Sequence, residues 1–253
     1  MREVALVTGG ARGIGRASAL ALASAGYDVA VLDLDAVDTE DIRSLRAAVV
    51  AANVRFHYCT ADVTRRADVD AAAAACVAEL GAPAILVNNA GKGSDPVPLE
   101  TLSEDGWDAS VALNLKGAFL CSRALVGHMK ARGRGVIVNI ASTAGRGDSP
   151  NSGAAYASAK AGIVGFTRQI ARELGPFGIR VNAIAPGSIL TGRAAARFER
   201  ADAPARERTL QAIPLRRMGR PEDVAHVIVF LASPAASFIT GAVLDVNGGR
   251  SMV

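Results

Sequence analysis

Near its beginning the chain reads Thr8-Gly9-Gly10-Ala11-Arg12-Gly13-Ile14-Gly15, a glycine-rich loop that follows an apolar run and opens an Ala- and Leu-rich one. In such a loop Gly9 permits a tight turn, Gly13 lets the backbone approach a pyrophosphate, and Gly15 lets the following helix pack closely on the strand. Asp33, which ends the next apolar run, can accept hydrogen bonds from ribose hydroxyls. Strand, loop, helix and acid together predict a dinucleotide-binding site.

The alternation of short apolar runs and longer Ala-rich runs continues along the whole chain. The expected strands are 4–8, 28–33, 55–60, 84–88, 135–141, 179–185 and 242–246. The expected helices are 14–24, 39–52, 65–80, 104–131, 154–174 and 222–232. The pattern predicts an α/β fold: a doubly wound, seven-stranded, mostly parallel sheet with helices on both faces, Rossmann-like, in one domain over residues 1–253. Ligands of such sheets bind outside the carboxyl ends of the strands.

Composition excludes several classes of protein. Half of the 253 residues are apolar and 21% are charged, so the chain is not a disordered one. It contains no unbroken run of about 20 apolar residues, and its first residues do not resemble a signal peptide. The cysteines, Cys59, Cys76 and Cys121, are too widely spaced to indicate a disulfide framework or a zinc site. We therefore expect a cytoplasmic protein with no metal site and no membrane partner.

The net charge of +4 is concentrated in residues 188–220, which hold eight arginines against three acids, a local charge of +5. Nucleic-acid binding would require stacking aromatic side chains as well, and this segment offers only Phe198. We expect no nucleic-acid partner. The segment either attracts an anionic substrate or is a solvated helical lid in an arginine-rich chain, and the sequence leaves both interpretations open.

Tyr156 and Lys160 lie four residues apart in an expected helix, so their side chains share one face. A nearby ammonium group, with the positive ring of an oxidised nicotinamide, favours the phenolate and lowers the pKa of a tyrosine toward neutrality. Tyr156 can then serve as general acid for ketone reduction and general base for alcohol oxidation. Ser142, after the expected strand 135–141, could hydrogen-bond the same substrate oxygen.

These features resemble the short-chain dehydrogenase/reductase family, whose nucleotide loop reads T-G-x-x-x-G-x-G. The other matching motifs follow in order as Asp62-Val63, Asn88-Asn89-Ala90-Gly91, Asn114, Ser142, Tyr156 with Lys160, and Pro186-Gly187 with Thr191. The closing stretch, Ile239-Thr240-Gly241 to Val246-Asn247-Gly248-Gly249, most resembles the β-ketoacyl-carrier-protein reductase branch.

The resemblance implies a role for each motif. Asp62 would bond the adenine amino group, Asn88 would pack beside the adenosine ribose, Asn114 would support a proton relay from Lys160, and Thr191 would bond the nicotinamide carboxamide. The expected catalytic residues are Asn114, Ser142, Tyr156 and Lys160. The expected cofactor-binding residues are Gly9, Arg12, Gly13, Ile14, Gly15, Asp33, Asp62, Val63, Asn88, Ala90, Gly91, Tyr156, Lys160, Pro186, Gly187, Ile189 and Thr191. The family also implies a homotetramer built through long helices.

Two residues bear on the choice between NAD and NADP. The Asp33 carboxylate would repel a 2′-phosphate by about 3 kcal/mol per unit charge pair, at roughly 5 Å and an effective dielectric near 20. Arg12 lies where related NADP-dependent enzymes keep a phosphate-binding arginine, but we favour its interpretation as a solvated loop charge or a partner of Asp33. We expect NAD, with NADP as the alternative.

The sequence thus predicts an NAD(P)-dependent short-chain alcohol dehydrogenase or ketoreductase acting on a small-molecule secondary alcohol and its ketone. The polar residues Asp148, Ser149 and Asn151 could contact such a substrate. The alternative is a β-ketoacyl thioester reductase that takes an acyl carrier protein or CoA thioester. The Arg-rich segment favours this alternative, and so do the basic residues near the helices that dock an acidic carrier in the carrier-protein reductases: Arg132, Arg134, Arg168 and Arg172. A non-catalytic nucleotide-sensing protein is a remote third hypothesis.

Overall fold

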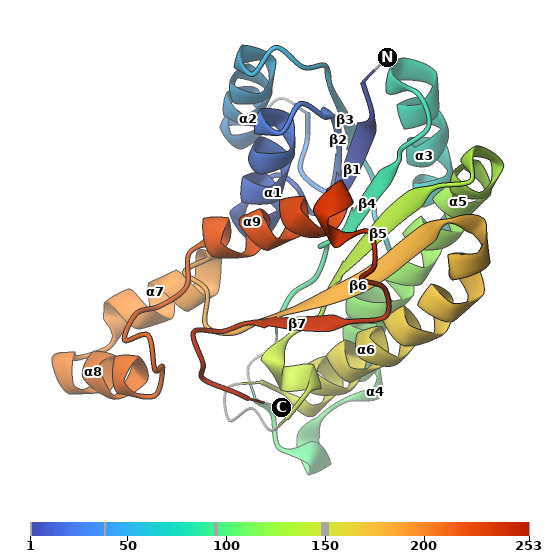
Figure 1. The fold of residues 1–253 in the computed structure, drawn as a ribbon. Coiled ribbons are helices and arrows are strands. Elements are labelled where there is room, and N and C mark those ends of the chain that lie inside the picture. The colour runs from blue at the N-terminus through green and yellow to red at the C-terminus, as the bar shows by residue number, and fades with distance from the viewer. Residues whose placement is uncertain (1, 38, 94–95, 148–151, 253) are drawn as a thin grey trace.

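The central element of the computed structural model is a sheet of seven parallel strands in the order β3-β2-β1-β4-β5-β6-β7 (Figure 1). The structure describes residues 2–37, 39–93, 96–147 and 152–252. The strands are β1 (Val4–Thr8), β2 (Asp28–Asp33), β3 (Phe56–Thr60), β4 (Ile85–Asn88), β5 (Gly135–Ile140), β6 (Ile179–Pro186) and β7 (Val243–Val246). The predicted fold class is confirmed. Nine of the fourteen strand ends agree with the expected bounds, and the other five differ by one residue.

Helices cover both faces of this sheet. They are α1 (Gly13–Ser24), α2 (Glu40–Ala51), α3 (Arg66–Leu80), α4 (Glu104–Val111), α5 (Gly117–Arg132), α6 (Ala154–Leu174), α7 (Gly192–Arg200), α8 (Ala203–Gln211) and α9 (Pro221–Ala232). One hydrophobic core joins α1, α2 and α9 to the sheet, and a second joins α3, α5 and α6 to its other face. Because both faces are covered, β1 and β5 are buried at every residue, which explains why their sequences are apolar except for Thr8 and Asn139.

The strand order reverses between β1 and β4, which neighbour each other although β2 and β3 lie between them in the sequence. Connections leave β1 and β4 in opposite directions across the sheet, so a crevice opens at their carboxyl ends. The glycine loop follows β1, and Asn89-Ala90-Gly91 follows β4. The topology therefore brings these two predicted motifs to the same crevice.

The expected single helix 104–131 is interrupted. Between α4 and α5 the segment Ala112–Lys116 is a π-helix, and Asn114 lies inside it. The run Glu104–Arg132 has 29 residues, and an 18-residue stretch of it has a mean hydropathy of 1.2, so by length and composition alone it is long and apolar enough to cross a membrane. The core helix of a soluble protein passes the same test, and here Leu120, Leu125 and Met129 pack into the core beside α3.

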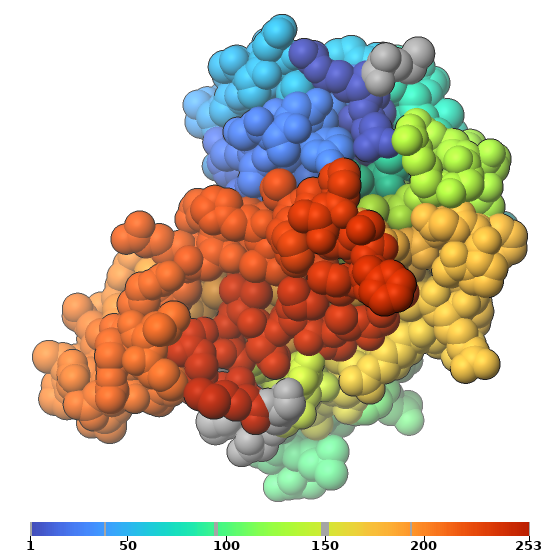
Figure 2. Space-filling model, in the orientation of Figure 1, coloured from blue at the N-terminus to red at the C-terminus, as the bar shows by residue number. Residues whose placement is uncertain are grey.

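The segment 188–220 carries two helices, α7 and α8, for which the sequence pattern gave no bounds. They extend away from the sheet and its covering helices, at the lower left of the molecule (Figures 1 and 2). The segment is anchored at its base, where Ile189 pairs with Gly219 and the Leu190 amide donates to the Gly219 carbonyl at 2.8 Å.

Candidate active site

The glycine loop forms a close-fitting backbone cradle. Gly13 has φ of +55° in the left-handed region, and a Cβ there would lie 3.2 Å from Thr191 Cγ2. A Cβ at Gly15 would lie only 2.0 Å from the Gly9 carbonyl oxygen. The side chain of Arg12, the N-cap residue of α1, does not cap that helix end in the part of the chain that the structure describes. A loop that has no room for side chains, at the N-terminus of a helix, fits a pyrophosphate.

The loop is bound tightly to the end of β4. Thr8 Oγ1 accepts from the amides of Asn89 at 3.1 Å and Ala90 at 3.0 Å. In return, Asn89 Nδ2 donates to the carbonyls of Thr8 at 3.0 Å and Gly9 at 2.9 Å. Thr8 and Asn89 were quoted within the sequence motifs but given no role. Their polar character at two strand ends was the only signal available, because their contact joins residues about 80 apart.

Asp33 lies at the mouth of this loop. Its Oδ2 accepts from the Ala11 amide and its Oδ1 from the Leu34 amide, both at 2.8 Å. Arg12 Nη2 forms an ion pair with Asp35 Oδ2 at 2.9 Å. Arg12 Nε forms a second ion pair with Asp41 Oδ2, to which it donates a hydrogen bond. The hydrogen bond to Asp41 and the charge of Asp35 raise the pKa of Arg12. The ion pairs of Arg12 are with these two carboxylates, which the β2–α2 connection and the start of α2 bring over the loop, while Asp33 acts on Arg12 through its charge alone.

The predicted adenosine-side residues make well-defined contacts. Asp62 Oδ1 accepts from the Thr64 amide and hydroxyl, both at 2.8 Å, and Val63 is buried, where it lies against Gly117. The side chain of Asn88 is buried, and its Nδ2 donates to Ser122 Oγ at 3.0 Å and to Asn139 Oδ1 at 2.8 Å.

Asn139 in turn donates to Thr167 Oγ1 at 2.9 Å. This buried chain of polar side chains connects β4, α5, β5 and α6 directly beneath the carboxyl edge of the sheet. Ser122, Asn139 and Thr167 had no place in the sequence motifs, since buried polar residues within apolar runs carry no distinctive spacing.

Tyr156 and Lys160 lie on the first two turns of α6, as their spacing predicted. Lys160 Nζ donates to the Ile140 carbonyl at 2.7 Å and lies 5.7 Å from the centre of the Tyr156 ring. Burial lowers the pKa of Lys160 to about 8. The ammonium is thus held at the end of β5 and next to the phenol, whose side chain is half-buried.

Ser142 is brought to the same place by a 3₁₀ turn, Thr143–Gly145, in which the Ala144 amide donates to Ser142 Oγ at 3.2 Å. The turn packs directly on the backbone of α6. A Cβ at Gly145 would lie 2.4 Å from the carbonyl carbon of Lys160. The positions of Ser142 and Lys160 are therefore coupled through backbone contact.

Asn114 completes the group from the opposite side. Its Oδ1 accepts from the Lys92 amide at 3.0 Å, and its Nδ2 donates to the carbonyls of Lys92 and Ser110, both at 3.1 Å. A Cβ at Gly91 would lie 2.7 Å from Asn114 Oδ1 and 3.2 Å from Lys160 Nζ. Gly91 thus lies against both side chains, and the π-helix, a form often found at functional sites, aims Asn114 at the loop.

The loop after β6 forms the remaining wall. Pro186 ends the strand, and the Gly187 amide donates to the Val246 carbonyl at 3.0 Å. Ile189 is buried, and Thr191 lies against Gly13 of the nucleotide loop. The structure thus brings the predicted residues after β1, β4, β5 and β6 to one edge of the sheet, whereas Asp148, Ser149 and Asn151 lie outside the described residues.

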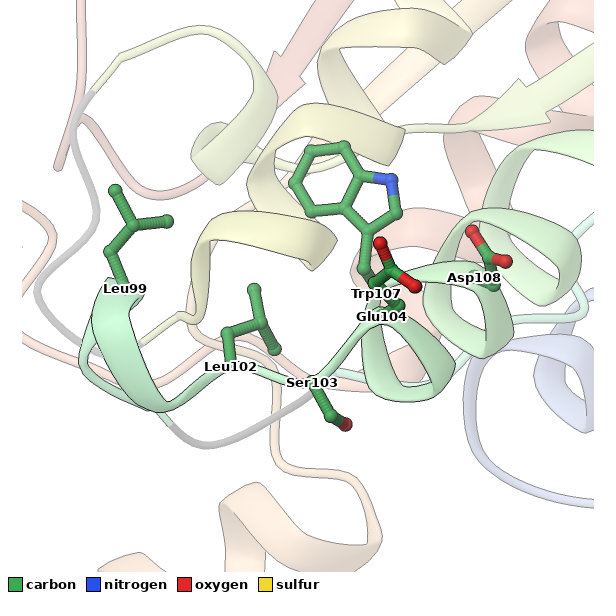
Figure 3. Close-up of a pocket in the computed structure, with 6 residues that line it drawn as sticks. All are labelled: Leu99, Leu102, Ser103, Glu104, Trp107 and Asp108. Carbon is green, nitrogen blue, oxygen red and sulfur yellow. The ribbon is translucent and has the colours of Figure 1, made fainter.

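Two surface hollows lie near the start of α4. The larger, of 440 Å³, is lined by Leu99, Leu102, Ser103, Glu104, Trp107 and Asp108 (Figure 3). The smaller, of 330 Å³, reaches Gly153, Ala154 and Ala155, which directly precede Tyr156. None of the predicted site residues lines either hollow, so the crevice described above is the candidate active site.

The parallel sheet, the glycine cradle and the cluster of Ser142, Tyr156, Lys160 and Asn114 define a Rossmann-like oxidoreductase. Comparison with known proteins agrees. The family model described as Enoyl-(Acyl carrier protein) reductase matches residues 9–251. The chain belongs to the short-chain dehydrogenase/reductase family, and the predicted resemblance is confirmed.

Similar proteins cover the full length of this chain. It is 41% identical over 253 residues to the (2S)-[(R)-hydroxy(phenyl)methyl]succinyl-CoA dehydrogenase subunit BbsD of Thauera aromatica, covering 99% of this chain and 97% of that protein. It is 41% identical over 251 residues to a 3-oxoacyl-[acyl-carrier-protein] reductase of Synechocystis sp., with the same coverage. The crystal structure of levodione reductase superposes with a TM-score of 0.91 at 35% identity, covering 98% of this chain and 97% of that one.

Proposed function

We propose that this protein catalyses reversible hydride transfer between NAD and a secondary alcohol or its ketone, with Tyr156 as the general acid and base. The observation that carries the proposal is the buried Lys160 ammonium, bonded to the Ile140 carbonyl and held 5.7 Å from the Tyr156 ring centre. A buried cation beside a phenol favours the phenolate, which is the form that accepts a proton from an alcohol.

The other residues of the site have supporting roles in this proposal. Ser142 orients the substrate oxygen and stabilises charge that develops on it. Asn114 holds the Lys92 backbone, beside Gly91 that lies against Lys160, and supports proton movement from that lysine. When bound, the nicotinamide ring donates or accepts the hydride, and the loop after β6, with Thr191, bounds the space beside it.

The proposed cofactor site uses the cradle of Gly9, Gly13 and Gly15 for the pyrophosphate and Asp33 for the adenosine ribose. The Asp33 carboxylate has both oxygens fixed by backbone amides, so it cannot turn away from the mouth of the loop without losing two hydrogen bonds. A fixed negative charge there favours ribose hydroxyls over a 2′-phosphate. This supports NAD as the preferred cofactor.

The second candidate is reduction of a β-ketoacyl thioester carried by CoA or by an acyl carrier protein. The names of two relatives, a succinyl-CoA dehydrogenase subunit and a 3-oxoacyl-[acyl-carrier-protein] reductase, favour it. The projecting α7–α8 segment, with its local charge of +5, offers an anionic substrate a cationic approach. The Asp33 carboxylate argues against an NADP-linked biosynthetic reductase.

In either case we propose that the protein works in the cytoplasm.

A stereochemically resolved panel of alcohols, sugars and acyl thioesters, assayed with NAD and with NADP, tests these proposals. Turnover of simple secondary alcohols with NAD, insensitive to salt, supports the first. Turnover of acetoacetyl thioesters that falls steeply with salt supports the second, because screening weakens attraction to the arginines. Cofactor binding without turnover of any member would contradict both.

A further inference from the structure

The Arg12 guanidinium is held between two carboxylates that come from different elements. Asp35, in the connection after β2, pairs with its Nη2 at 2.9 Å, and Asp41, in the first turn of α2, pairs with its Nε. The start of α2 is joined to α1, because the Asp41 backbone carbonyl accepts from Arg16 Nη1 at 2.9 Å. The loop arginine thus pairs with a helix end that has a second contact with α1.

These contacts use the donors that Arg12 would need for another anion. A guanidinium binds phosphate through parallel N–H groups along one edge, and here the Nε and one Nη already point at carboxylates. The nearby Asp33 adds a third negative charge, and its Oδ2 accepts from Ala11, the residue that precedes Arg12. A 2′-phosphate arriving here would have to displace two ion pairs.

We propose that Asp35 and Asp41 are cofactor-specificity residues, which act by restraining Arg12 so that it cannot bind the 2′-phosphate of NADP. This rests on the proposed function, in which the glycine loop holds a nicotinamide dinucleotide. Asp33 then repels the phosphate directly, whereas Asp35 and Asp41 are positioning residues that act through Arg12. The chain thus keeps an arginine that could bind a phosphate, but the carboxylates of Asp35 and Asp41 occupy its N–H donors.

Calorimetric titration of NAD and NADP into the full-length protein tests this without any turnover. Asp41→Asn should tighten NADP binding about tenfold, the effect of one charge-assisted hydrogen bond gained, and change NAD binding less than about twofold. Asp35→Asn should act in the same direction, and the double variant should exceed either. The matched control is Glu40→Gln, which removes the same charge one residue away from a carboxylate that pairs with Arg43 and not with Arg12.

Arg12→Ala distinguishes two reasons why Asp41→Asn could tighten NADP binding: release of the Arg12 side chain, or the loss of a negative charge near the phosphate. In the unaltered protein it should change NADP affinity less than about twofold, and in the Asp41→Asn background it should abolish the gain. Equal gains from Glu40→Gln and Asp41→Asn would overturn the proposal, as would a gain that survives Arg12→Ala. If the unaltered protein bound neither dinucleotide, the proposed function itself would fail. Binding of NAD with no response to Asp35 or Asp41 would overturn only this inference.

Discussion

At the level of single residues, the most costly feature of the site is the buried ammonium of Lys160. It has one charge-assisted hydrogen bond, to the Ile140 carbonyl, and burial lowers its pKa to about 8 from the usual 10.5. A fold that retains a lysine in this state loses stability relative to one with an apolar residue there. That cost is consistent with a functional reason for the charge.

The pH dependence of stability checks this state of Lys160. Between about pH 8 and about pH 10.5 the unfolded chain holds the proton more tightly than the folded one, so unfolding takes up a proton and stability rises with pH. The unaltered protein should therefore gain up to about 3 kcal/mol relative to Lys160→Met across this window, with a constant difference below it. Urea unfolding of both proteins measures the difference. Parallel curves throughout would contradict a depressed pKa.

Spacing and position predicted which residues gather at the crevice, but not all of their contacts. Tyr156 and Lys160 follow from helical periodicity, and Ser142 from its place after a buried strand. The partners of Arg12 do not follow, because Asp41 reaches it only through the way α2 lies over the loop. Asn89 and the chain from Asn88 to Thr167 likewise depend on tertiary contacts that no local pattern encodes.

At the level of elements, the strands and most helices follow from apolar periodicity, whereas the π-helix does not. A π-helix needs only one extra residue in a turn, and Ala112–Lys116 has an ordinary helical composition. The 3₁₀ turn Thr143–Gly145 is similarly short, and its importance lies in its contact with α6.

Gly145→Ala should displace that turn from α6. The new methyl group would meet the Lys160 backbone at 2.4 Å, and neither side of this contact is a flexible side chain. We expect a loss of about 1 to 3 kcal/mol in unfolding free energy and a fall of at least about tenfold in turnover. Gly147→Ala is the control, since a Cβ there meets none of the described residues within 4 Å. If both variants behaved like the unaltered protein in unfolding and activity assays, the proposed coupling would be wrong.

At the level of the whole molecule, the sheet order follows from the alternation of strands and helices, but the outline of the α7–α8 segment does not. Most of the described residues of α7 and α8 are exposed, so burial in the core does not indicate where the segment lies. The expected homotetramer also stays a prediction. In the long helices expected to form its interface, Gly117 packs inside the chain against Val63, while Gly165 on α6 is exposed.

Sedimentation measurements on Gly165→Arg test assembly through α6. A side chain at Gly165 meets nothing within 4 Å in the single chain, so the fold should be unaffected. We expect the tetramer to dissociate to dimers or monomers, because an arginine would be buried without a partner at a close helix-helix contact. Ala48→Arg, on an exposed position of α2, should leave assembly unchanged. A tetramer that survives Gly165→Arg would place the interface elsewhere.

The central claim, that the Tyr156 hydroxyl transfers the proton while the rest of the site binds and orients, is tested most directly by Tyr156→Phe. The measurement pairs single-turnover formation of reduced nicotinamide with calorimetric binding of NAD. We predict a loss of at least about a thousandfold in the rate, with cofactor affinity within about threefold of the unaltered protein. A rate that stays within about tenfold while the cofactor still binds would contradict the account.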